Sequence, residues 1–227
     1  MKKTSAFTLI ELLVVISIIA VLATLAVPAV TNALVKGQMT GTMNNARQLY
    51  LAGFQMATDG AANSDANLAW PGASPPPANL QDYCTRLVNN GYLNGADLSK
   101  ILSAPGATCS ASVTTSNNAT NVNLNGNSAL KVYPVTDADP SNTIFAVTSN
   151  YTYNTAFTGT PVNPYGDKGF VVIRKGGDAS TLRKNNAAVS GTGASAISAF
   201  ESSVGKKPGD APGTVTPGDP SGVLTHP

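Results

Sequence analysis

The 227-residue chain has few charged side chains and a single histidine. Charged residues make up 11% of it, well below the roughly 25% of ordinary soluble domains. The formal net charge is only +2, which gives no electrostatic reason to expect nucleic acid as a partner. The one histidine, His226, lies beside the C-terminus. The sequence therefore predicts neither a histidine-based catalytic relay nor a histidine metal cluster, and we expect no enzyme and no cofactor.

Cysteine is also scarce, with only Cys84 and Cys109 present. A small even number of cysteines in an exported chain favours a disulfide, and the N-terminal segment described next argues for export. The bond would close a loop of about 26 residues, which the chain-entropy model values at roughly 3–4 kcal/mol. Two separate buried thiols are the alternative.

One long uncharged run stands at the N-terminus. Leu12 to Val35 contains no charged residue. As a helix this run reaches ~36 Å, enough to cross a hydrocarbon layer of ~30 Å. Lys2 and Lys3 precede it, so the N-terminus should remain in the cytoplasm. The remainder of the chain would then face the periplasm or the exterior.

Glu11 is the exception at the front of this apolar stretch. A carboxylate costs about 2.5–3.5 kcal/mol near the bilayer centre and less near the interface, and a buried charge that persists usually has a partner. The next basic residue along the helix is Lys36, which is out of reach. The partner would therefore come from another subunit, or from a new amino group if the chain were cut just before Phe7.

The string from Lys2 to Ile16, KKTSAFTLIELLVVI, resembles the class III signal of type IV pilins and type II secretion pseudopilins. The resemblance implies that prepilin peptidase, a membrane aspartyl protease, cuts between Ala6 and Phe7 and methylates the new Phe7 amine. The family usually has glycine before the cut, where this chain has Ala6. The resemblance also implies that Glu11 meets the Phe7 amine of a neighbouring subunit during assembly.

The function that this resemblance implies is structural. The chain would be a subunit of a membrane-rooted helical filament, either a type II secretion pseudopilus or a type IV pilus. Its partners would be identical or related pilin subunits, prepilin peptidase, the inner-membrane assembly platform and the membrane. It would lie in the bacterial inner membrane as a single-pass protein, with its head in the periplasm or on an extracellular filament. Many type IV pilins have a disulfide loop near the C-terminus. A disulfide between Cys84 and Cys109 would lie far from it, so the resemblance favours a pseudopilin.

Other interpretations stay open at this point. A cleaved secretory signal peptide shares the basic start and apolar core, with a cut after Ala26, Ala29 or Ala33, although Glu11 inside the apolar region argues against it. A plain membrane anchor explains the span but not the Phe-Thr-Leu-Ile-Glu string. A binding module is the alternative function, namely a minor pilin at a filament tip that contacts a surface, a sugar or DNA.

The predicted fold class is α+β, with a long N-terminal helix packed on a small antiparallel sheet, an order that also resembles the pilin fold. Pro28 should kink the helix. Five segments are expected: a leader over residues 1–6, a transmembrane or filament-core helix over 7–35, its amphipathic continuation over 36–59, a globular head over 60–204 and an extended, mobile Pro/Gly-rich tail over 205–227.

Within the head the pattern predicts two short helices and three strands. The first helix covers Leu80 to Asn90, and the second runs to Leu102 with Asp97 as its cap. The interval 106–128 is polar with little periodicity, and the interval 175–204 indicates only a helical turn over Ala196 to Phe200. The three predicted strands are Leu130–Val135, Thr143–Tyr153 and Gly169–Arg174.

Two acidic loops are candidates for calcium. Asp137 and Asp139, followed by Ser141 and Thr143, offer oxygen ligands at alternate positions. The segment Gly176-Gly177-Asp178 resembles the calcium-binding loop of major pseudopilins, in which Asp178 would be a ligand. Ordinary Asp-rich turns are the alternative.

Overall fold

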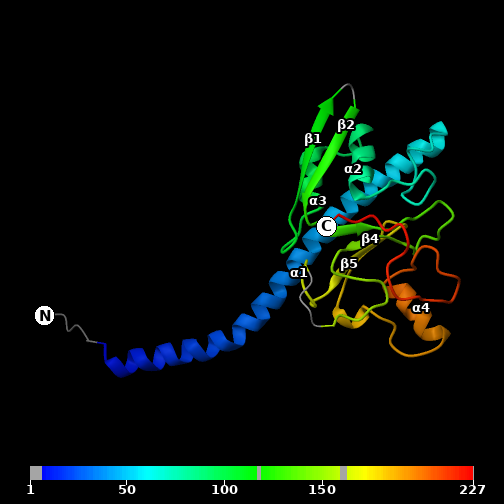
Figure 1. The fold of residues 1–227 in the computed structure, drawn as a ribbon. Coiled ribbons are helices and arrows are strands. Elements are labelled where there is room, and N and C mark those ends of the chain that lie inside the picture. Colours follow the sequence, from blue (N-terminus) through cyan, green and yellow to red (C-terminus); the bar gives the residue numbers. More distant parts are fainter. Residues whose placement is uncertain (1–6, 117–118, 159–162, 227) are drawn as a thin grey trace. The chain divides into compact units, whose positions relative to one another are not determined.

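The computed structural model describes residues 7–116, 119–158 and 163–226 (Figure 1). It separates into two compact units, residues 1–37 and residues 38–227. The helix α1, Leu9–Asn63, supplies most of the first unit and the first element of the second. Of the described residues 7–37 none is buried, and Met39 is the first buried residue in the part of the chain that the structure describes.

In the second unit α1 presents one face to a core. Its buried residues recur at helical spacing because they face the same side of the helix, and they are Met39, Thr42, Ala46, Leu49, Tyr50, Ala52, Gly53, Met56, Ala57 and Gly60. Tyr50 packs edge-on against Phe145, with ring centroids 5.5 Å apart, and Trp70 packs edge-on against the same ring at 5.9 Å. The amphipathic continuation predicted over 36–59 thus covers an apolar surface.

The helix continues one turn past its predicted end near Gly60. A Cβ atom at this position would lie 1.8 Å from the carbonyl oxygen of Leu68. The residue is therefore glycine because the loop passes close to the helix at this point, and not because the helix ends there. The chain leaves the helix at Ser64, whose φ of 57° lies in the left-handed region.

Two short helices follow, α2 (Leu80–Asn89) and α3 (Gly95–Ile101). The prediction for α2 is confirmed, including its end at Gly91, where φ is +75°. The cap predicted for α3 is wrong. Asn94 is the N-cap, and its side chain accepts a hydrogen bond from the backbone N of Asp97 at 3.1 Å.

The polar interval 106–128 contains a hairpin that the sequence did not indicate. Strands β1 (Cys109–Ser116) and β2 (Ala119–Gly126) pair antiparallel. The backbone donors on their outer edges are capped by side chains of α2, of α3 and of the turn after α3. The pairs are Val122 N with Thr85 Oγ1, Leu124 N with Gln81 Oε1, Ala111 N with Ser99 Oγ and Cys109 N with Ser103 Oγ, at 3.2, 3.1, 2.8 and 3.0 Å.

The second sheet is an antiparallel meander of four strands in the order β3-β4-β5-β6. The three predicted strands are confirmed with shorter bounds, and β6 was not predicted. The strands are β3 (Leu130–Val132), β4 (Ile144–Thr148), β5 (Phe170–Arg174) and β6 (Ala179–Leu182). One face packs on α1 through Phe145 and Ile173. The other face packs on a second cluster with Phe200 of α4 (Ala194–Ser203). This is the α+β, pilin-like architecture that the sequence predicts.

The tail after Gly205 is extended but is not free, which corrects the expectation of mobility. Leu224 is buried and bridges Val132 of β3 through two backbone hydrogen bonds of 3.0 and 2.8 Å. Lys207 is 7% exposed, and its Nζ donates to the carbonyl oxygens of Thr216 at 2.8 Å and Gly218 at 3.2 Å. Proline and glycine here shape turns that dock on the sheet.

Candidate membrane-anchoring and assembly segment

Glu11 closes a reciprocal cap at the start of α1. Its Oε2 accepts hydrogen bonds from the backbone N of Thr8 at 2.8 Å and from Thr8 Oγ1 at 2.7 Å. In return, the backbone N of Glu11 donates to Thr8 Oγ1 at 3.3 Å. This is a capping box, in which the N-cap and the N3 side chain satisfy each other's backbone donors. The carboxylate also lies at the positive end of the helix dipole, where negative charge is favoured.

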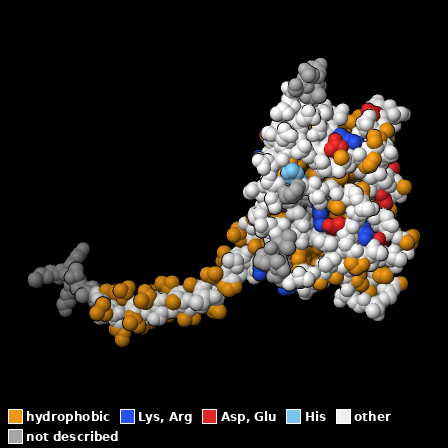
Figure 2. All heavy atoms as spheres, viewed as in Figure 1, with side chains coloured by type: hydrophobic (Ala, Val, Ile, Leu, Met, Phe, Trp, Pro, Cys, Tyr) orange, Lys and Arg blue, Asp and Glu red, His pale blue; other side chains and the backbone are white. Residues whose placement is uncertain are grey.

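The helix behind this cap is apolar on all sides. Its most apolar 18-residue window has a mean hydropathy of 2.8 and no buried residue. Figure 2 shows hydrophobic side chains over the visible face of this segment. Leu9 and Leu25 are among the most exposed, at 88% and 73%. A helix that is hydrophobic all round requires an apolar environment such as a membrane or a bundle of like helices. This helix is long and apolar enough to cross a membrane.

Pro28 lies inside α1, which runs through it without a break. Proline has no N–H, so the carbonyl of Thr24 loses its usual donor. Two threonine hydroxyls bond to backbone carbonyls nearby, Thr24 Oγ1 to Val21 at 2.7 Å and Thr31 Oγ1 to Pro28 at 3.0 Å. The predicted kink stays a prediction.

Of the two residues at the predicted cleavage site, Phe7 is the first described residue and is 72% exposed, whereas Ala6 lies outside the described residues.

The disulfide predicted between Cys84 and Cys109 is not formed, because both residues are free thiols in the structure. Both belong to the same core cluster and are 0% and 3% exposed. Burial raises the pKa of both thiols, which keeps them protonated and slow to exchange. In this state each cysteine acts as a small apolar core residue.

The calcium candidates are not gathered into one group. The carbonyl oxygens of Asp137 and Asp139 both accept hydrogen bonds from Lys175 Nζ at 2.7 Å. The carboxylate of Asp139 accepts hydrogen bonds from the backbone N and the hydroxyl of Thr136. Basic and hydroxyl side chains thus already use these oxygens. Over the described ranges, no three His, Cys, Asp or Glu side chains form a group that could hold a metal ion.

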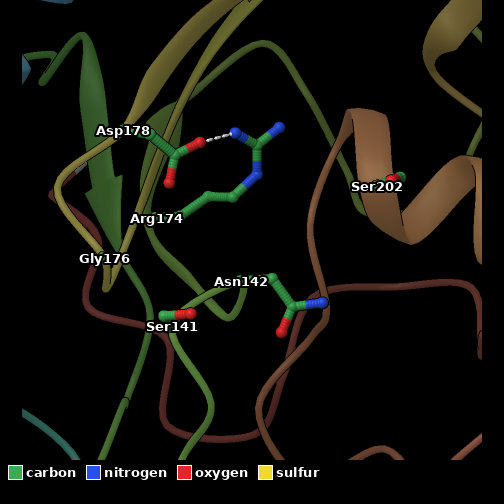
Figure 3. A pocket seen from close by; sticks show the side chains of 6 residues that line it. All are labelled: Ser141, Asn142, Arg174, Gly176, Asp178 and Ser202. Atoms are coloured by element: carbon green, nitrogen blue, oxygen red, sulfur yellow. Dashed lines mark hydrogen bonds and ion pairs between the residues drawn. The ribbon is translucent and has the colours of Figure 1, made fainter.

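Asp178 lines a separate polar hollow of about 340 Å³. Its carboxylate turns toward the guanidinium of Arg174 and forms an ion pair with it (Figure 3). The same guanidinium donates to the carbonyl oxygens of Ser203 and Val204. Arg174 therefore ties the end of α4 to the sheet, and the partner of Asp178 is this arginine.

The capping box is the feature of the site that the sequence reasoning missed. Its signal was available, since a Thr followed three residues later by Glu just before an apolar run is a known helix-start pattern. Glu11 thus has two possible tasks, one within its own helix and one between subunits.

Together these features define an α+β protein whose exposed apolar helix is long enough to cross a membrane and begins at a capped carboxylate. The family model described as the prokaryotic N-terminal methylation motif matches residues 1–27. The match is confined to the N-terminus, where the motif indicates a resemblance to type IV pilins and pseudopilins, which are generally structural proteins. No curated protein and no solved structure matches the chain at a significant level.

Proposed function

We propose that the chain is a structural subunit of a membrane-rooted helical filament, a type II secretion pseudopilus or a type IV pilus. Prepilin peptidase cuts it between Ala6 and Phe7 and methylates the Phe7 amine. The mature subunit waits in the inner membrane, with its head on the far side from the cytoplasm. The assembly platform then adds it to identical or related pilin subunits through α1.

The observation that carries the proposal is the methylation motif on a helix whose apolar side chains are exposed on every side. Such a helix can exchange a lipid environment for a bundle of neighbouring helices without a change in its own fold. Glu11 favours one position of the incoming helix in this exchange, because its charge is stabilised best where a neighbour's Phe7 amine lies nearby. Parallel, staggered helices bring such an amine within reach.

Intact mass spectrometry of the membrane-extracted chain tests the processing step. We expect a mature chain that begins at Phe7 and carries one added methyl group. A start at Val27, Val30 or Leu34 would indicate a secretory peptidase and would overturn the filament proposal. Shearing of cells that produce the protein then separates the two filament types. A type IV pilus appears in the sheared fraction, whereas a pseudopilus subunit stays with the cells.

A further inference from the structure

Three basic side chains lie exposed at one end of the four-stranded sheet. Phe170 of β5 pairs with Leu182 of β6, so the residues just beyond this pair lie close together at the same end of the two strands. Lys168 lies on one side of the pair, and Arg183 and Lys184 lie on the other, all exposed. We call these three residues the basic rim.

The basic rim lies beside the first buried turn of α1. The Tyr165 hydroxyl is 2.5 Å from Thr42 Oγ1 and donates to the carbonyl oxygen of Gln38 at 3.3 Å. The carbonyl oxygen of Tyr165 accepts the backbone N–H of Lys168 at 3.2 Å. At the neighbouring Gly169, an added Cβ would lie 2.7 Å from Met39 Cε. These contacts fix the loop that carries Lys168 against residues 38–42 of the helix.

Residues 38–42 follow closely on the apolar run. That run ends at Val35, three to seven residues earlier, and a helix rises 1.5 Å per residue, which gives ~5–10 Å of chain. The polar headgroup layer on one side of a bilayer is roughly 5–8 Å thick. The electrostatic screening length is about 8 Å at physiological ionic strength. The chain itself therefore brings the basic rim within electrostatic reach of the lipid headgroups.

The charge of the basic rim is only partly neutralised. Lys184 Nζ lies 3.1 Å from Asp167 Oδ2. This contact, together with the nearby charge of Lys168, holds the pKa of Asp167 below its usual value. Across the part of the chain that the structure describes, no acidic side chain forms an ion pair with Lys168 or Arg183. Three cations and one carboxylate leave a local charge of about +2, which favours an anionic partner.

We propose that the basic rim binds the headgroups of anionic phospholipids and holds the head of the unassembled subunit on the bilayer surface. This inference rests on the proposed membrane anchoring. Lipid is the partner because the apolar helix places a bilayer next to the basic rim in every subunit, before any protein partner arrives. Binding restricts the tilt of the head relative to the membrane. Assembly then exchanges these headgroup contacts for contacts with the filament.

The test uses the full mature chain in vesicles of phosphatidylcholine, with or without added phosphatidylglycerol. A fluorophore at Asn185→Cys, an exposed position beside the basic rim, reports energy transfer to a lipid-borne acceptor. The native thiols are buried and remain unlabelled in the folded chain. We expect more transfer in the anionic vesicles, and a loss of the difference near 1 M salt, where the screening length falls to roughly 3 Å.

The variant that removes the contact is Lys168→Gln with Arg183→Gln, which leaves the Lys184–Asp167 pair in place. Each basic residue near an anionic surface changes the ratio of bound to free head about fivefold, so we expect a decrease on the order of 20-fold. The matched control is Arg47→Gln with Lys100→Gln, two exposed residues outside the basic rim. Arg47 follows Val35 by 12 residues, ~18 Å of helix, and the carbonyl oxygen of Lys100 accepts a hydrogen bond from Asn45, 10 residues after Val35. It removes the same charge and should change the ratio less than about twofold.

The possible failures can be told apart. Equal transfer in neutral and anionic vesicles, from a chain that resists alkaline carbonate extraction, would overturn the lipid contact and leave the anchor intact. A chain that carbonate extracts would contradict the membrane anchoring itself. A basic-rim variant that lowers filament yield without any change in energy transfer would assign the basic rim to a protein partner, and would also overturn this inference.

Discussion

The carboxylate of Asp219, in the C-terminal tail, lies 2.5 Å from Nζ of Lys131 in the buried strand β3. The same carboxylate accepts a hydrogen bond from the hydroxyl of Tyr133 at 2.6 Å. The lysine side chain is 5% exposed and the aspartate 21%. Burial lowers the pKa of Lys131, and Asp219 opposes that effect. The tail thus supplies the partner of a charge that the sheet buries.

Asp219→Ala should destabilise the head by about 3–5 kcal/mol, because it leaves the buried Lys131 ammonium without its counter-ion. Urea unfolding at neutral pH measures the change. Lys131→Met with Asp219→Leu should recover most of the loss, since an apolar pair of similar volume needs no counter-ion.

Asp167→Ala provides the matched control, because the Asp167–Lys184 pair has the same chemistry but lies exposed at 36% and 58%. It should change the free energy of unfolding little. Equal effects of Asp219→Ala and Asp167→Ala would show that the tail contact does not stabilise the fold.

Two substitutions at Glu11 separate its cap from its charge. Gln can still accept the hydrogen bonds from Thr8, so Glu11→Gln keeps the capping box without the charge, whereas Glu11→Val removes both. If the charge meets a neighbour's amine, both variants should lower filament yield sharply and to a similar extent. Both should be inserted and cleaved normally, since the proposed cleavage site before Phe7 lies four residues upstream. Filament sheared from cells, compared with the membrane pool of cleaved monomer, measures the effect. Normal yield with Glu11→Val would remove Glu11 from the assembly contact.

The cysteines should be inert in the folded protein and reactive after unfolding. Thiol exchange and alkylation require the thiolate, which burial disfavours at Cys84 and Cys109. We expect an alkylating reagent to label neither residue in the native chain and both in urea without a reductant. An unfolded, unreduced chain that takes up no label would show instead that the pair becomes oxidised after export.

Stability should decrease in alkaline solution. Burial raises the folded-state pKa of Cys84, Cys109 and the core tyrosines, so protons are held longer in the folded chain than in the unfolded chain. The stability that the protonated thiols contribute is complete below the unfolded thiol pKa of about 8.5 and is lost as the pH rises above it. Urea midpoints measured between about pH 7 and pH 10 should fall at the upper end. With Cys84→Ala and Cys109→Ala combined, the fall should begin only near the unfolded tyrosine pKa of about 10. A midpoint that rises with pH would contradict this account.

The sequence was most informative where one physical requirement governs many consecutive residues. The apolar run from Leu12 to Val35 predicts a helix long enough to span a membrane, and the structure has one continuous helix there. The buried strands β4 and β5 were equally clear, because both of their faces are covered and their residues are nearly all apolar.

The hairpin was missed because its residues differ little in polarity. Val122 and Leu124 are buried between exposed asparagines, an alternation of period two that is the signal of a half-buried strand. Ser, Thr and Asn fill most other positions of both strands, and this polar composition made the interval resemble a loop. The docking of the tail could not be predicted for a different reason. The partner of Asp219 lies 88 residues away in the chain, and composition carries no information about such a pairing.

The caps on the hairpin edges bear on how the subunits meet one another. A strand edge with open N–H groups can recruit the edge of another chain, and this risk grows when many identical heads share one membrane surface. Here Gln81, Thr85, Ser99 and Ser103 occupy four of those donors from within the same molecule. These four positions therefore offer no open donor to the edge of another chain, which lowers the tendency of neighbouring heads to pair strand to strand. In the proposed filament, self-association is then left to the apolar helix and not to the hairpin edges.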